Sequence, residues 1–523
     1  MSFFFSKSKF VSVCNTCNKY AWLDKNHPDD KKPIDEYTET LFENGHKVGA
    51  LAKERFKIDV DVTVLDENGK PNISAMLEET KKALSADAHV IAEASFEYDG
   101  LFCSVDILVK NGDGSYDINE VKSSKRNLEK EKKRDGVKEK YIIDAAYQQY
   151  ILEKLGYKIN NVYVVLLSDT YVRGKSLDLE QYFIPVPVKT FTSALQTMVE
   201  EKLADIEAVL GEQNEPTAVF NANCKDCDYF AFCSRKIPSP SVFDIYEKTS
   251  PTKHQLYNAG ISFFDAPKHT TSMKEAAKKQ IEYYNRPNDA YIDKDAIKEF
   301  LDSLSFPLYS LDFETYQAVV PEHEGMKVSE VVPFQYSLHV MRVPDGDYSE
   351  GSVDLEECHF IDISGADPRR AIAESLVKDI PYGACVVAYH ESTERNIIER
   401  LADLYPDLAD HLRSFGYINS KGEKRYKDPL PLFQNGCYYT SAMGNKFSIK
   451  SVLPALYPDD PSMNYHNLNG SVQNGTQAMI AILQANDMSE EGRDRIESDL
   501  VEYCALDTFA VVKVIKKLYE VSK

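Results

Sequence analysis

Two apolar stretches of the chain carry acidic side chains where a buried β-strand would ordinarily hold only hydrophobic ones. Residues 102–110 (FCSVDILVK) contain one carboxylate, Asp106, and residues 308–315 (LYSLDFET) contain two on one face, Asp312 and Glu314. Burying carboxylates in an apolar setting is costly unless a cation offsets their charge. The pattern therefore favours strands that hold buried acids, and it predicts a divalent-cation site on each.

The length and punctuation of the chain predict three regions. At roughly 150 residues per domain, 523 residues correspond to about three domains. Two prolines in Lys236-Ile-Pro-Ser-Pro-Ser resist regular structure. We expect an α/β domain over 1–237, a helical connector over 238–303 and a third domain over 304–523. Helices are expected near 35–56 and 138–155, and strands near 101–110, 116–122 and 161–168.

The composition is that of a soluble globular protein, with 43% hydrophobic and 28% charged residues. No apolar run approaches the roughly 20 residues that a membrane helix requires, and the N-terminal apolar run is too short for a secretory signal. We therefore expect no membrane association and a cytoplasmic location. The net charge of -22 argues against indiscriminate coating of nucleic acid. Residues 122–140 are locally basic, which fits either a solvated helix with i,i+4 ion pairs or a phosphate-steering surface.

The first acidic strand is followed by a hairpin signal. The turn Asn111-Gly-Asp-Gly leads into residues 116–122 (YDINEVK). Glu120 and Lys122 are two residues apart, so their side chains point to the same face of a strand. In this arrangement Asp106 and Glu120 would bind a divalent metal, and Lys122 would orient water or stabilise developing negative charge. An ordinary surface Glu–Lys pair is the alternative interpretation.

Asp106 followed by Glu120-Val-Lys122 resembles the core motif of the RecB-like PD-(D/E)xK nucleases. Gly45-His46 and the residues after it resemble the helix that supplies a metal-binding His in that family, which implies His46 as a further ligand. Residues 144–150 (DAAYQQY) resemble the helix that carries a Gln near the active site, which implies Gln148. The Tyr usual four residues after that Gln is Leu152 here.

A cysteine cluster lies near the end of the first domain. The run Cys224-x2-Cys227-x5-Cys233 favours a bound metal or cluster, and both zinc and an iron–sulfur cluster need a fourth ligand. The pattern Cys17-x-Lys-x-x-Trp-Leu, followed far downstream by this run, resembles the iron–sulfur subgroup of RecB-like nucleases. The resemblance implies a [4Fe–4S] cluster held by Cys17, Cys224, Cys227 and Cys233, with Cys17 preferred to Cys14 by its distance from Trp22. Zinc and inert buried thiols remain the alternatives.

The second acidic strand has counterparts further along the chain. Tyr503 and Asp507 are four residues apart in a helical pattern and share a face, and residues 384–394 run from a strand into a helix. Together these segments resemble the DnaQ-like 3′→5′ exonucleases of the RNase H-like fold. The resemblance implies that Tyr503 positions the attacking water, and that the metal ligands are Asp312, Glu314, Glu394 and Asp507. Glu394 departs from the Asp normal in that superfamily.

Two further segments bear on architecture. Residues 256–266 resemble the hairpin of a helix-hairpin-helix element, in which Gly260 would permit a tight turn. A plain connecting pair of helices is the alternative. Residues 447–458 (FSIKSVLPALYP) resemble a segment of a bacterial domain of unknown function that follows a RecB-like domain in fusion proteins.

These resemblances imply an α/β chain with a restriction-endonuclease-like domain stapled by an iron–sulfur cluster, a helical connector and an RNase H-like exonuclease domain. The expected activity is phosphodiester hydrolysis at two sites with Mg²⁺ or Mn²⁺, and the expected partner is nucleic acid, with DNA favoured. Two alternatives remain. In the first, one domain is active and the other, most plausibly the third, is an inactive nucleic-acid-binding platform. In the second, the protein is a non-catalytic iron–sulfur scaffold in repair or defence.

Overall fold

The computed structural model describes residues 4–523 except 247, 344–352, 417–425, 469 and 486–487. The chain forms two compact units, of which the first comprises residues 1–237 and 318–330, and the second comprises residues 238–317 and 331–523. The division at residue 237 coincides with the end of the predicted first domain. The predicted connector is grouped with the second unit, and the short segment 318–330 is grouped with the first.

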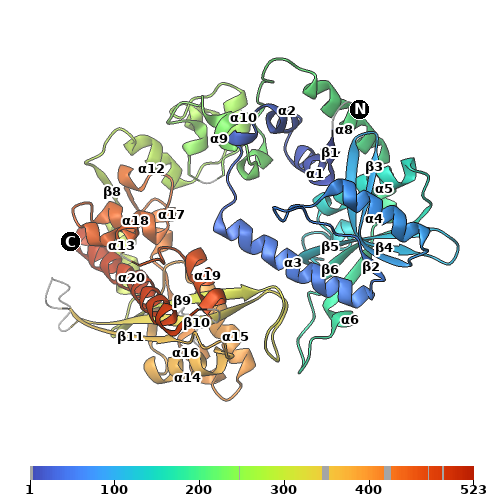
Figure 1. Ribbon diagram of the computed structural model, residues 1–523. Coiled ribbons are helices and arrows are strands. Elements are labelled where there is room, and N and C mark those ends of the chain that lie inside the picture. Colours follow the sequence, from blue (N-terminus) through green and yellow to red (C-terminus); the bar gives the residue numbers. More distant parts are fainter. Residues whose placement is uncertain (1–3, 247, 344–352, 417–425, 469, 486–487) are drawn as a thin grey trace. The chain divides into compact units, whose positions relative to one another are not determined.

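The first unit is built on a mixed seven-stranded sheet (Figure 1) with the order β2-β3-β4-β5-β6-β7, in which β1 pairs with β4. The predicted hairpin is confirmed, because β4 and β5 are antiparallel and Lys110 pairs with Tyr116 across the turn. The strands are β1 (Phe5–Ser6), β2 (Val60–Asp61), β3 (Val90–Tyr98), β4 (Leu101–Lys110), β5 (Tyr116–Lys125), β6 (Ile159–Leu167) and β7 (Phe183–Pro187).

The expected helices of the first unit are also present, α3 as Glu36–Phe56 and α5 as Glu139–Lys154. In β4, Leu101, Cys103 and Val105 are buried, which places Asp106 on the opposite side of the strand. The remaining helices are α1 (Lys7–Asn15), α2 (Lys19–Asn26), α4 (Ile73–Ser85), α6 (Leu179–Tyr182), α7 (Lys189–Ala194), α8 (Gln196–Leu210) and α9 (Phe230–Ser234).

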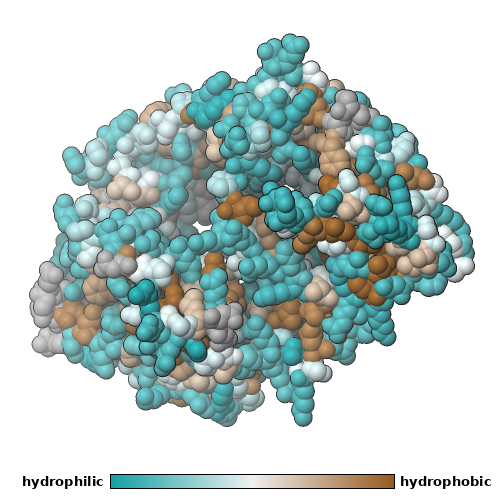
Figure 2. All heavy atoms as spheres, in the orientation of Figure 1, coloured by the Kyte–Doolittle hydropathy of each residue, from teal (hydrophilic) through white to brown (hydrophobic). Residues whose placement is uncertain are grey.

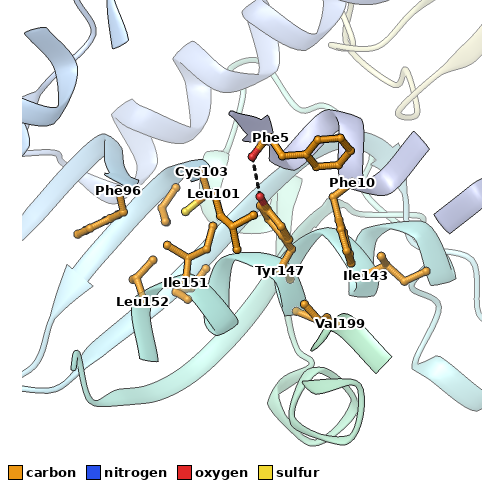
Figure 3. Close-up of a cluster of buried hydrophobic side chains, with 14 of the residues drawn as sticks. Phe5, Phe10, Phe96, Leu101, Cys103, Ile143, Tyr147, Ile151, Leu152 and Val199 are labelled. Carbon is orange, nitrogen blue, oxygen red and sulfur yellow. Dashed lines mark hydrogen bonds between the residues drawn. The ribbon is translucent and has the colours of Figure 1, made fainter. Parts of the chain in front are cut away.

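The core of the first unit joins the N-terminal segment to α5. Figure 3 shows the Tyr147 ring beside Phe10, with the Tyr147 hydroxyl pointing at the Phe5 carbonyl. The two rings stack with centroids 4.6 Å apart, and the hydroxyl donates to the Phe5 carbonyl at 2.7 Å. Fully buried aromatic contacts of this kind stabilise a fold by area and geometry together. The N-terminal residues are therefore part of the domain core.

The second unit contains a five-stranded sheet with the order β11-β10-β9-β12-β13 and a two-stranded sheet of β14 and β8. The parallel neighbours β9 and β12 place Ser310 beside Val387. Ser310 also donates to the Thr508 carbonyl of α20 at 2.9 Å, which fixes this helix against the acidic strand. The strands are β8 (Ala290–Ile292), β9 (Leu308–Ala318), β10 (Glu330–Arg342), β11 (Asp354–Ile361), β12 (Cys385–Val387), β13 (Tyr426–Lys427) and β14 (Tyr438–Thr440).

The helices of the second unit include the expected C-terminal helix, α20 (Glu490–Ser522). The proposed helix-hairpin-helix segment forms two short helices, α10 (Lys253–Asn258) and α11 (Ala266–His269), with Gly260 at a φ of 73° in the turn. The others are α12 (Glu275–Tyr283), α13 (Lys294–Asp302), α14 (Arg369–Asp379), α15 (Ser392–Leu404), α16 (Ala409–Gly416), α17 (Leu430–Gln434), α18 (Ile449–Leu456) and α19 (Gly475–Gln484).

The face of the molecule drawn in Figure 2 is predominantly polar. On the face drawn in Figure 2, hydrophilic residues dominate and hydrophobic ones appear in small separate groups. Among the residues that the structure describes, no helix combines the length and apolar character needed to cross a bilayer.

Candidate metal centres

The first centre forms where β4, β5 and α5 meet. The register that pairs Ile107 with Asn119 brings Asp106 opposite Glu120, as the sequence predicts. Asp106 also accepts from the Val121 backbone N–H at 2.7 Å, which fixes its carboxylate toward β5. The Glu120 side chain is 1% exposed and that of Asp106 is 26% exposed. The centre thus has one deeply buried acid and one that solvent or a substrate can reach.

Lys122 and Gln148 both contact this centre, as the resemblance implies. The Lys122 ammonium lies 2.6 Å from Glu120 and 2.7 Å from a third carboxylate, Asp144. The Gln148 side-chain amide donates to Glu120 at 2.7 Å and to Asp144 at 3.1 Å. The Gln148 Oε1 atom is buried without a hydrogen-bond partner. Sequence reasoning gave Asp144 no role, although its position one helical turn before Gln148 puts both side chains on one face.

Lys7, at the start of α1, was not anticipated from the sequence. Its ammonium donates to both oxygens of Glu120, at 3.0 and 3.1 Å, and to the Ser104 carbonyl at 3.2 Å. The same nitrogen lies 3.8 Å from Asp144 and 3.9 Å from Asp106. No local pattern marks this lysine, because its position follows from the packing of α1 and β1 against distant strands.

The charges of the first centre nearly cancel. Burial raises the pKa of Glu120 to about 7, and the neighbouring carboxylates Asp106 and Asp144 add to the effect. Burial would also raise the pKa of Asp144, but Lys122 and Lys7 lower it below its ordinary value. Burial works against both ammonium charges, yet the carboxylates raise the pKa of each lysine. Three carboxylates therefore face two charged lysines.

His46 lies on α3, where the buried residues are Val48 and Ala52. Its side chain is exposed, and within the described parts of the chain no hydrogen bond or ion pair joins it to Asp106 or Glu120. A residue two positions from Val48 points about 200° away around a helix of 3.6 residues per turn. The assignment of His46 as a metal ligand stays a prediction.

The four predicted cluster cysteines are close enough to influence one another electrostatically. Burial raises the pKa of Cys227 to about 11, and Cys17, Cys233 and Cys224 add to this rise. Asn221 links the two segments, because its side chain donates to the Thr16 carbonyl at 3.2 Å and its backbone N–H donates to Cys224 at 3.3 Å.

Cys14 stands apart from this group. Burial also raises its pKa to about 11, but the charge that acts on it belongs to Lys202 and to none of the four cysteines. The structure therefore groups Cys17, rather than Cys14, with the downstream run.

The second centre lies on β9 and α20. Asp312, Glu314 and Cys504 each offer a possible ligand atom within 4.8 Å of the others. Asp507, which is 9% exposed, accepts from the Tyr465 hydroxyl at 2.6 Å. This arrangement brings the D-x-E strand and the C-terminal helix together as the sequence predicts. Cys504 was not anticipated as part of it.

Glu394 enters the same centre from the first turn of α15, where it is 4% exposed. Its Oε2 atom is buried and has no hydrogen-bond partner among the described residues. Mutual effects on pKa connect Glu394 with Asp312. The residue thus reaches the centre despite the extra methylene relative to Asp.

Tyr503 is held in place by Lys450, a residue for which the sequence predicted no role. Lys450 donates to the Tyr503 hydroxyl at 2.7 Å and to the Gln473 carbonyl at 3.2 Å. Its ammonium also lies 4.6 Å from the centroid of the Tyr503 ring and 5.0 Å from that of Tyr465. Lys450 lies in the segment 447–458, which resembles part of a bacterial domain of unknown function. That resemblance was the sequence signal that could have pointed to this lysine.

The charges of the second centre do not cancel. Burial raises the pKa of Asp312 well above its ordinary value, and Asp507, Glu394 and Glu314 add to the rise. Burial likewise raises the pKa values of Glu314 and Glu394, each to about 8. Burial also raises the pKa of Asp507, although Tyr465 and Lys450 each lower it in part. Among the residues that the structure describes, four carboxylates therefore face one lysine, Lys450.

Comparison with known proteins finds a matching domain family. Residues 309–448 match a domain of unknown function, DUF2779. The matched range includes Asp312, Glu314 and Glu394. The chain is also similar to a solved protein described as "Crystal structure of SSO0001", with 12% identity over 46% of this chain and 89% of that chain and a TM-score of 0.22. No curated protein matches.

Proposed function

We propose that this protein is a divalent-metal-dependent nuclease with two phosphodiester-hydrolysing sites, acting on DNA. The observation that carries the proposal is the convergence of four buried carboxylates, Asp312, Glu314, Glu394 and Asp507, of which only Glu314 and Asp507 feel the charge of Lys450. Buried carboxylates of like charge require protons or cations to offset them. Oxygen donors of this kind suit Mg²⁺ and Mn²⁺.

The unpaired Glu394 Oε2 atom supports a bound cation at the second centre, because a buried polar atom without a partner is costly. Bound divalent ions would lower the pKa of a water molecule and offset charge on a phosphate. The Tyr503 hydroxyl accepts a hydrogen bond from Lys450. Burial raises the pKa of Asp507, and the hydrogen bond from Tyr503 to its carboxylate lowers that pKa in part. Tyr503 is therefore held at the edge of the carboxylates, where it can orient an attacking water.

In the first centre, Asp106 and Glu120 are the proposed ligands and Lys122 the group that stabilises negative charge. The ion pairs with Glu120 and Asp144 hold the Lys122 ammonium in place, and they keep it charged. A fixed positive charge beside a reacting phosphate stabilises the transition state without reorganisation. The unpaired Gln148 Oε1 atom is available to accept from a water in the same place.

The proposed nucleic-acid partner is supported by a cationic cluster beside this centre. The ammonium groups of Lys122, Lys138 and Lys140 lie 5.3, 5.7 and 5.4 Å from the centroid of the Tyr141 ring. The Tyr141 hydroxyl hydrogen-bonds the Ser124 hydroxyl at 2.7 Å, which fixes the ring. Several lysines around one aromatic ring suit a nucleic-acid backbone, since phosphates bind the charges and a base can stack.

We also propose that Cys17, Cys224, Cys227 and Cys233 hold a [4Fe–4S] cluster that staples the two ends of the first domain. The support is their proximity, since Cys17, Cys233 and Cys224 all act on the pKa of Cys227. Both a [4Fe–4S] cluster and zinc take four ligands, and the resemblance to the iron–sulfur subgroup favours the cluster.

The cluster is tested by anaerobic purification of wild-type, Cys17→Ser and Cys14→Ser proteins. Visible absorbance from thiolate-to-iron charge transfer and bound iron are expected in the wild type and in Cys14→Ser, but not in Cys17→Ser. Colourless wild-type protein that contains zinc would replace the iron–sulfur assignment with a zinc site.

The nuclease proposal is tested with single-stranded DNA, double-stranded DNA and RNA, each with Mg²⁺, Mn²⁺ or chelator. Wild type, Lys122→Ala and Asp507→Ala are compared on 3′- and 5′-labelled substrates. We expect metal-dependent cleavage of DNA, with different products lost in the two variants. Absence of cleavage on every substrate would instead support a non-catalytic scaffold, and loss of products in one variant only would leave a single active site.

A further inference from the structure

The geometry points to Lys7 as a resident counter-cation of the first centre. Its ammonium occupies the space among Glu120, Asp144 and Asp106 in which a divalent ion would be held, and it must leave before that ion can bind. This inference rests on the proposed function of the same centre and concerns how the centre takes up its metal.

The contacts of Lys7 resemble those of a bound cation. Both oxygens of Glu120 and the Ser104 carbonyl surround the ammonium at 3.0 to 3.2 Å, and Asp144 and Asp106 follow at 3.8 and 3.9 Å. Mg²⁺ requires oxygen ligands at about 2.1 Å. The four lone-pair positions of the Glu120 carboxylate are already taken, at Oε1 by Lys7 and Lys122 and at Oε2 by Lys7 and Gln148. An ion that close to the carboxylate must displace one of these donors, and Lys7 is the one that contacts both oxygens. The two cations therefore exclude each other.

The charge count gives the same result. Glu93 also acts on Asp106, but Lys53 lies 3.5 Å from Glu93 and offsets its charge. With every carboxylate ionised and Lys7 and Lys122 both in place, the remaining three carboxylates and two ammonium groups leave the centre with one net negative charge. Without Lys7 the remaining groups carry two net negative charges, which one divalent ion balances. With Lys7 and the ion together, the buried centre would carry a net positive charge, and such an uncompensated charge is costly. Departure of Lys7 and uptake of the ion are thus coupled.

The movement requires only the side chain of Lys7. Its backbone is fixed on both sides, because Ser6 pairs with Phe102 in the sheet and Phe10 stacks on Tyr147 (Figure 3). Its side chain is 17% exposed, so a route to solvent exists along its flexible four-carbon stem. Lys122 has shorter ion pairs, at 2.6 and 2.7 Å. Lys7 is therefore the lysine whose side chain leaves the centre when the ion binds.

The inference is tested by Mn²⁺ binding rather than by cleavage. Mn²⁺ is titrated by electron paramagnetic resonance into the full-length chain carrying Asp312→Asn and Asp507→Asn, which silence the second centre. Adding Lys7→Met removes the charge and keeps an unbranched chain. We expect Mn²⁺ affinity to rise by about tenfold or more at a site that Glu120→Gln abolishes, since a competing charge within 4 Å is removed.

A matched control is Lys9→Met on the same helix, because Lys9 pairs with Asp24 at 2.7 Å and is 45% exposed. This variant should leave Mn²⁺ affinity unchanged. Lys7→Gln serves as a second neutral variant in case Lys7→Met folds poorly. Equal or weaker affinity in the folded Lys7 variants, with Glu120-dependent binding in the parent, would overturn the inference. Absence of Glu120-dependent binding in every variant would instead overturn the proposed metal site itself.

Discussion

The two acidic centres use similar side chains but balance their charges differently. In the first, Asp106, Glu120 and Asp144 are paired with two lysines and a glutamine amide. In the second, four carboxylates share one lysine among the described residues, and Glu394 has an oxygen with no hydrogen-bond partner among them. A centre with internal counter-ions can stay ionised without metal, whereas one without them must take up protons or cations. The two centres should therefore respond oppositely when an acid is neutralised.

The largest stability effect is expected from Asp144→Asn. The Asp144 side chain is 9% exposed, lies 2.7 Å from Lys122 and 3.8 Å from Lys7, and has a pKa that these lysines hold below its ordinary value, so its loss leaves two buried ammonium groups short of one partner. We expect the first unit to lose about 3 kcal/mol of stability at pH 8 without metal. Trp22 is the only tryptophan in the sequence and is buried in this unit, so its fluorescence during denaturation measures the change.

In the second centre, neutralising an acid should increase the stability of the metal-free protein. Asp312→Asn removes one of four like charges, so the metal-free second unit should gain about 1 to 2 kcal/mol at pH 8. Hydrogen exchange of peptides from α20 measures this gain, with Asp312→Asn compared to wild type in chelator. If α20 exchanges faster in the variant, the four carboxylates are not in net repulsion and the comparison between the centres fails.

The pH dependence of stability should separate the centres further. Glu314 and Glu394 have pKa values raised to about 8, above those of an unfolded chain. Their contribution to stability is fully present below about pH 4.5 and is lost as the pH rises through about 8. Without metal, protection of α20 should therefore fall between pH 6 and 9, and Mg²⁺ should restore it. Equal protection at both pH values in chelator would contradict the raised pKa values.

The smallest effect is expected from Glu394→Asp, which introduces the residue usual in the DnaQ-like superfamily. The backbone of α15 places a Glu in this centre, so shortening it by one methylene withdraws the carboxylate by about a bond length. We expect 3′-end removal to fall by about tenfold, or ~1.4 kcal/mol. Terminal nucleotide release under single-turnover conditions measures it. An increase in rate would indicate that the native middle motif is impaired and that the second centre is inactive or nearly so.

Local periodicity explains which parts of these centres could be predicted. The alternation of strands placed Glu120 with Lys122 and Asp312 with Glu314, the hairpin placed Asp106 across from Glu120, and helical spacing placed Tyr503 with Asp507. Lys7 and Lys450 could not be found in this way, because ordinary lysines acquire a role only when distant segments pack together. The grouping of residues 318–330 with the first unit also depends on packing between distant segments, so it could not be predicted from local patterns. The side chains that set the charge balance were therefore the least predictable ones.

The most direct test of the central claim compares Asp106→Asn, Asp312→Asn and the double variant in metal-dependent DNA cleavage. Products are followed from both labelled ends of one DNA substrate. If the protein holds two independent hydrolytic centres, each single variant keeps the products of the other centre and the double variant cleaves nothing. Residual metal-dependent cleavage by the double variant, or complete loss in either single variant, would contradict the account.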